Sequence, residues 1–109
     1  MPTRALVVDD DACPVAVAVS AVRSVVAGPA LTPVPTCPPV VLGLANVRGD
    51  VIPVFDCGLL LERDPLGAAP FVVVVETRAG PAGLAVPSMP RTATVEDGDV
   101  FDPDKVVSR

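Results

Sequence analysis

The chain contains no histidine, no tryptophan and no tyrosine, and it has a single lysine. The absence of histidine excludes imidazole-based acid–base catalysis, phosphohistidine transfer and nearly every imidazole metal site. The formal net charge of −5 leaves no basic surface for nucleic acid or anionic lipid. No phosphate-binding loop or nucleophile motif occurs. We therefore expect a non-enzymatic protein without a metal or cofactor.

Cysteine is also scarce, with residues only at positions 13, 37 and 57. The number is odd and the spacing is wide, which favours three reduced, mostly buried thiols over a disulfide framework. The first residues lead into no long apolar segment, so no signal peptide is expected. No apolar run reaches the roughly 20 residues of a membrane span. These features predict a cytoplasmic location without membrane insertion.

What the chain does have is aliphatic residues and proline. Half of its 109 residues are hydrophobic, valine is abundant and there are fourteen prolines. A chain of this length forms one domain, here residues 1–109. Because β-branched residues favour strands and proline interrupts helices, we predict an all-β (mainly β) fold with one or two short helices.

The order of apolar runs and breakers places the elements along the chain. Alternating valines between 14 and 19 predict a strand with only one buried face. The five prolines between 28 and 39 predict a rigid extended crossing. Strands are expected at 5–8, 14–19, 40–47, 51–55, 71–75, 83–86 and 92–95, a short helix at 58–62, and a helical turn at 104–107 capped by Asp102. A small barrel or a pair of barrels fits this pattern best.

The runs at 40–47 and 51–55 flank a short turn and predict a β-hairpin. Gly49 would supply the positive φ that such turns need. Pro53 lacks an N–H group, so its strand is expected to be an edge or bulged there. Asp56 is suited to cap the short helix.

This hairpin carries the most specific motif, Gly-Leu-Ala-Asn-Val-Arg-Gly-Asp-Val-Ile-Pro-Val-Phe-Asp at 43–56. It resembles the signature of the CheW-like domain, found in bacterial chemotaxis coupling proteins and in the kinase CheA, and meets every specified position. The segments 13–17, 22–26, 31–35, 72–75 and 83–86 are also similar to the family. The resemblance implies two intertwined SH3-like β-barrels and no catalysis. The short stretch between 96 and 107 implies that the second barrel is incomplete.

The resemblance also implies a function and a set of contact residues. The protein would be a chemotaxis adaptor that couples a chemoreceptor's cytoplasmic tip to the histidine kinase CheA. Arg48 is the main candidate contact, since its planar fork of donors suits a partner's carboxylate or carbonyl groups. The proposed partner-binding residues are Arg48, Gly49, Asn46, Val47 and Val22, and Gly43, Pro53 and Asp56 are structural members of the motif. Asn46 and Asp56 are expected to fix the turn and the helix start through local hydrogen bonds.

The sequence allows two other interpretations. The first is a response-regulator receiver, in which Asp9 and Asp10, after an apolar strand, would hold Mg²⁺. Asp56 would then be the phosphoryl acceptor, and Thr77 and Lys105 the switch residues. The alternative to metal binding is that the acidic residues at 9–11 form a solvated surface turn. A third reading is a degenerate CheW-like paralogue that has kept only one partner.

The strand at 71–75 also predicts self-association. It contains neither charge nor proline, so an unpaired edge there could pair with a second copy to form a homodimer. The opposite expectation is that the tail at 99–107 folds back over that edge within one chain.

Overall fold

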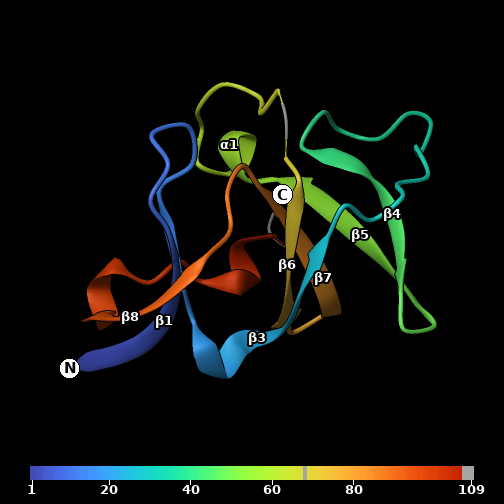
Figure 1. The fold of residues 1–109 in the computed structure, drawn as a ribbon. Coiled ribbons are helices and arrows are strands. Elements are labelled where there is room, and N and C mark those ends of the chain that lie inside the picture. The colour runs from blue at the N-terminus through green and yellow to red at the C-terminus, as the bar shows by residue number, and fades with distance from the viewer. Residues whose placement is uncertain (68, 107–109) are drawn as a thin grey trace.

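The computed structural model describes residues 1–67 and 69–106 and forms two β-sheets (Figure 1). The first, which we call the terminal sheet, is antiparallel with the order β2-β1-β8 and contains β1 (Pro2–Val8), β2 (Val15–Ala18) and β8 (Arg91–Glu96). The second, the central sheet, has the order β3-β6-β7-β5-β4 and contains β3 (Val22–Ala27), β4 (Val41–Val47), β5 (Asp50–Asp56), β6 (Phe71–Thr77) and β7 (Gly80–Val86). The predicted mainly β class is therefore confirmed.

The helical content is low but is divided among more turns than the one or two short helices predicted. The α-helix α1 (Cys57–Leu60) follows β5, and three 3-10 turns are added as η1 (Val19–Ala21), η2 (Asp97–Asp99) and η3 (Pro103–Val106). The predicted tail cap is present, because the Asp102 carboxylate accepts from the Asp104 N–H at 3.0 Å. Residue 107, the end of the predicted turn, lies outside the described residues.

The main core lies between the two sheets. Val15 and Val17 of the terminal sheet pack in one buried cluster with Val73, Val75 and other residues of the central sheet. The alternate residues of β6, Val72 and Val74, belong to a second cluster. Both faces of β6 are buried, which explains its unbroken run of valines.

The strand β2 corrects one expectation from the sequence. The valine alternation predicted one buried face, yet Val15, Ala16 and Val17 are all buried. Val15 and Val17 face the main core, whereas Ala16 packs with Ala5 and Val7 in a third cluster on the opposite face of the terminal sheet. Small side chains can be buried at these positions without disturbing the period-two pattern.

The strand β6 corrects a second expectation. It pairs with β3 on one side and with β7 on the other, so it has no free edge. The prediction of a homodimer through residues 71–75 is therefore wrong. Hydrophobic patterning identifies a strand but not its neighbours, and here β3 leaves its sequence neighbour β2 to cross into the central sheet.

The chain after β8 crosses from one sheet to the other. The Phe101 N–H donates to the Ala16 carbonyl oxygen at 2.7 Å, which covers part of the outer edge of β2. The Asp104 carboxylate then accepts from the Arg78 N–H at 2.8 Å, and the side chain of Val106 is buried in the main core. The tail thus folds back within one chain, where it covers part of the edge of β2 and packs η3 against a face of β6. It does not pair with an edge of β6, because β3 and β7 already occupy both edges.

A disulfide bond joins Cys13 to Cys57, whose Cα atoms are 6.1 Å apart. The prediction of three reduced thiols is wrong for these two residues, and Cys37 alone is a free cysteine among the described residues. The two partners are separated by 44 positions in the sequence, and only the fold brings the β1–β2 loop beside α1. The bond therefore connects the two sheets.

Thiol counting and unfolding measurements test this bond. Alkylation under denaturing, non-reducing conditions should modify one cysteine per chain, and three after reduction. The bond joins residues 44 positions apart. The double variant Cys13→Ser/Cys57→Ser lacks it and should have a free energy of unfolding about 4 kcal/mol lower than the wild type. The matched control, Cys37→Ser, should leave the urea midpoint almost unchanged. Three modified thiols before reduction would contradict the bond.

Candidate functional site

The β4–β5 hairpin presents Arg48 at the tip of a two-residue turn. Val47 pairs with Asp50, so Arg48 and Gly49 are the two turn residues. Their φ angles are 52° and 89°, and two positive values are typical of a type I′ turn. The Asn46 side-chain oxygen accepts from the Gly49 N–H at 3.1 Å, as predicted. The turn therefore holds Arg48 in one backbone conformation.

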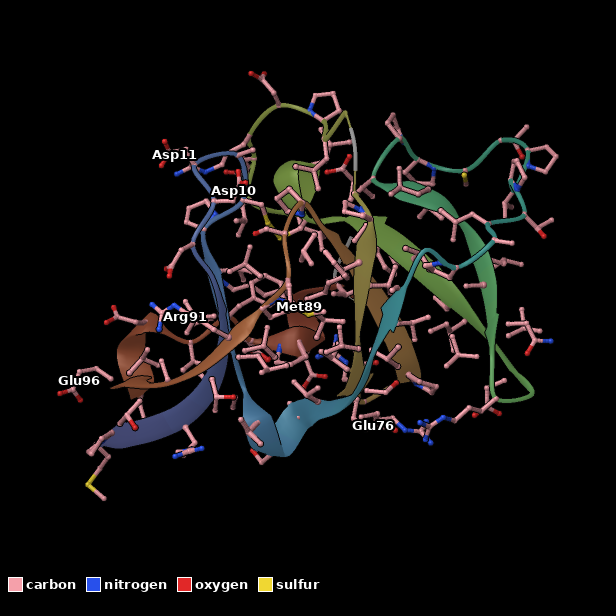
Figure 2. All side chains as sticks on the ribbon, viewed as in Figure 1. Asp10, Asp11, Glu76, Met89, Arg91 and Glu96 are labelled. Carbon is pink, nitrogen blue, oxygen red and sulfur yellow. A yellow bond between two sulfur atoms is a disulfide. The ribbon has the colours of Figure 1, made fainter. Side chains whose placement is uncertain are left out.

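Beside this turn lies a groove of about 250 Å³ built entirely from the central sheet. Its lining comes from β3, the hairpin and β6, and comprises Arg23, Ser24, Val47, Arg48, Asp50, Ile52 and Val74. Arg23 forms an ion pair with Glu76 at 3.7 Å, and both side chains are about half exposed. Figure 2 labels Glu76. Within the described residues Arg48 takes part in no ion pair. The groove thus offers one paired and one unpaired guanidinium.

The predicted contact residues separate into two groups. Arg48 and Val47 line the groove, and Asn46 and Gly49 form the turn that supports them. Val22 packs against the main core and does not line the groove. Arg23 and Ser24 also line the groove and were not among the predicted contact residues. They lie in the Val-Arg-x-Val segment, which is similar to the family.

Gly43 and Pro53 shape the hairpin from inside the sheet. A Cβ atom on Gly43 would lie 2.7 Å from the carbonyl oxygen of Thr32, so only glycine permits the close approach of the proline-rich crossing. Leu44 exchanges two backbone hydrogen bonds with Thr32, each 2.8 Å long. Pro53 pairs with Leu44 on one side, and pairing with β7 begins only at Val54. The missing N–H of Pro53 is therefore tolerated, as the predicted local edge requires.

Asp56 is the one buried charged residue in the described part of the chain, with 1% of its surface exposed. One carboxylate oxygen accepts from the Leu59 N–H at 3.1 Å and caps α1, as predicted. The other accepts from the Leu66 N–H at 3.0 Å and fixes the loop after α1. Asp56 is thus a structural residue whose two oxygens are already engaged.

The acidic turn after β1 behaves as a surface turn. Asp9 forms an ion pair with Arg91 at 2.6 Å, and the Asp10 carboxylate accepts from the Ala12 N–H at 2.9 Å. Figure 2 shows Asp10 and Asp11 on the loop between β1 and β2. No group of three or more potential metal ligands occurs among residues 1–67 and 69–106.

The observed fold contradicts the receiver interpretation. A receiver needs helices between parallel strands. Among the strands of residues 1–67 and 69–106, every pair is antiparallel except β5 with β7. The Thr77 hydroxyl donates to the Gly80 carbonyl oxygen at 2.7 Å within the β6–β7 turn, and Lys105 lies in η3. The proposed switch residues therefore belong to ordinary turns.

Comparison with known proteins agrees with this architecture. A family model for the CheW-like domain matches residues 5–108. The chain belongs to the CheW-like domain family. The scaffolding protein TtCheW from Thermoanaerobacter tengcongensis has a similar structure, with a TM-score of 0.78 and 24% sequence identity. The match covers 90% of this chain and 68% of TtCheW. No curated protein matches the chain.

Membership of the CheW-like family supports a scaffold or adaptor role in chemotaxis-type signalling. None of the helices in the described ranges is long and apolar enough to cross a membrane. The range matched by the family model includes the hairpin at 43–56.

Substitution of Asp56 tests its structural role. Asp56→Ala would leave the Leu59 and Leu66 N–H groups without acceptors and should lower the free energy of unfolding by about 2–3 kcal/mol. Asp56→Asn keeps one carbonyl oxygen as an acceptor, so it should lower the free energy of unfolding by less than Asp56→Ala does. The matched control is Asp64→Ala, because Asp64 is exposed and close to the same loop. Equal urea midpoints for the Asp56 and Asp64 variants would contradict the role.

Proposed function

We propose that this protein is an adaptor that couples a chemoreceptor's cytoplasmic tip to a CheA-type histidine kinase. The observation that carries the proposal is Arg48, which is held at the tip of the family's motif hairpin beside a groove and has no ion-pair partner in the described residues. We propose Arg48 and Val47 as direct contacts, with Asn46 and Gly49 as the residues that support them. Val22 is better assigned to the core.

The charges around the groove favour an acidic or carbonyl-rich protein segment as the occupant. The chain carries a net charge of −5, yet the groove is lined by two arginines and one aspartate. A guanidinium can donate to a carboxylate or to main-chain carbonyls in a bidentate manner. The surface ion pair of Arg23 with Glu76 contributes little stability, so a partner can replace it at small cost.

The hairpin also offers apolar contact area at low entropic cost. Val51, which follows the turn in β5, keeps 64% of its surface exposed. The type I′ turn and the Asn46 hydrogen bond already order the backbone before a partner arrives. Binding therefore loses less conformational entropy than it would through a flexible loop.

We propose a cytoplasmic location, because the receptor tip and the kinase lie there. A disulfide is uncommon in that compartment. However, Cys13 and Cys57 are only 0% and 2% exposed. Thiol exchange requires access to a sulfur atom, so cellular thiols would reach this buried bond slowly.

Titration against a receptor-tip fragment tests the role of Arg48. Arg48→Ala should weaken binding by about thirty-fold, which corresponds to about 2 kcal/mol for a charged anchor. The melting temperature should stay nearly unchanged, because an exposed turn residue has little packing to lose. Arg48→Lys should recover only part of the affinity, since lysine lacks the planar fork. The matched control is Arg78→Ala in the β6–β7 turn.

Two outcomes would contradict this assignment. Unchanged affinity of Arg48→Ala would show that the groove is not the contact, and equal weakening by Arg78→Ala would indicate a general charge effect. A parallel titration against the kinase regulatory domain separates the full adaptor from a paralogue with one partner. Binding of only one of the two proteins would favour the paralogue, for which the three-stranded terminal sheet is the supporting observation.

The absence of phosphoryl transfer is a separate expectation. Incubation with Mg²⁺ and acetyl phosphate should add no phosphoryl group, because both oxygens of Asp56 accept backbone hydrogen bonds and the residue is buried. Intact-mass spectrometry after incubation gives the answer. An acyl phosphate at Asp56 would contradict a purely binding function.

A further inference from the structure

Four strand edges remain at the sides of the two sheets among residues 1–67 and 69–106, and three of them are protected. The edge of β2 is short and receives the Phe101 N–H on the Ala16 carbonyl oxygen. The edge of β3 has a register shift between Val22 and Ser24 and carries the exposed Arg23. A bulge and a charged side chain both oppose pairing with another strand.

The edge of β4 is protected in a different way. Its register shifts between Val41 and Gly43, and the proline-rich crossing pairs with it through the two hydrogen bonds between Thr32 and Leu44. A second chain could reach only part of this strand.

The edge of β8 has none of these protections. It pairs with β1 through six consecutive residue pairs without a shift, from Pro2 with Glu96 to Val7 with Arg91. The segment from Thr92 to Val95 contains no proline, glycine or charged residue. Its outer side has no strand partner in the described part of the chain. An edge of this kind is a template for pairing with another strand.

We propose that β8 pairs antiparallel with β8 of a second copy of this chain, around a two-fold axis at Thr94. The two terminal sheets then form one continuous sheet of six strands. The inference is independent of the proposed adaptor function, because the groove beside Arg48 lies wholly in the central sheet.

The side-chain pattern of β8 sets this register. Ala93 and Val95 lie on the face that packs with Ala5, Val7 and Ala16. Pairing around Thr94 places Ala93 opposite Val95 of the second copy, so the apolar faces join, while Thr94 meets its own equivalent. Apolar pairs and threonine pairs directly opposite each other are favourable in antiparallel sheets.

The charges at the ends of β8 favour the same arrangement. Arg91 lies at one end, and Glu96 and Asp97 lie at the other (Figure 2 labels Arg91 and Glu96). Antiparallel pairing brings Arg91 of each copy to the acidic end of the other, whereas parallel pairing would join like charges. This local complementarity offsets the repulsion between two chains that each carry a net charge of −5.

Light scattering over a range of micromolar concentrations tests the dimer. The wild type should give about twice the monomer mass of 11.1 kDa. Thr94→Lys places two like charges at the axis and should yield the monomer. The matched control is Val51→Lys, which adds the same charge at the distant β4–β5 hairpin and should remain a dimer. A wild-type monomer, or a dimer that Thr94→Lys leaves intact, would overturn the proposal.

Cysteine cross-linking tests the register even if Thr94→Lys fails to fold. In a Cys37→Ser background, Thr94→Cys should form an intermolecular disulfide upon mild oxidation, because residues at the axis lie about 4.5–5.5 Å apart between Cα atoms. The matched variant Thr92→Cys should not cross-link, since its equivalents would be about 13 Å apart. Equal cross-linking at both positions, or none at position 94, would overturn the register and the proposal with it.

Discussion

The central strand β6 is the element on which the rest of the structure depends. Its valines point alternately into the core between the sheets and into the second cluster on the other face, and its two edges pair with β3 and β7. Each fully buried valine contributes about 1.5–3 kcal/mol of burial free energy. Because β3 crosses from the terminal sheet to reach β6, pairing at this strand fixes how the two sheets are joined.

The geometry of the candidate site depends on the packing of the central sheet. Val74 of β6 lines the groove beside Arg48, and Ile52 connects the groove to the buried cluster beneath it. Gly43 lets the proline-rich crossing approach β4 closely, which steadies the hairpin from its outer side. The position of one exposed guanidinium is therefore determined by packing well away from the turn, and not by the turn residues alone.

The sequence predicted local features well because their causes are local. Alternation, proline and glycine located the strands other than β3 (Val22–Ala27), which was not predicted. The Asn46 and Asp56 hydrogen bonds span at most ten residues. Contacts over long separations were not predictable in this way. The Cys13–Cys57 bond, the pairing of β6 with β3 and the burial of Ala16 on the second face all depend on which segments meet in space. Arg23 was missed for the same reason.

The two sheets divide the surface of the molecule between two kinds of contact. Register shifts on both edge strands of the central sheet oppose pairing with a further strand. A partner of this sheet would therefore contact the side chains that line the groove. The terminal sheet leaves β8 open, so a partner there would meet backbone hydrogen-bonding groups. The shared core and the Cys13–Cys57 bond hold the two sheets in a fixed relation. A dimer formed through β8 would therefore present two Arg48 grooves in a fixed relative orientation, as a rigid bivalent scaffold requires.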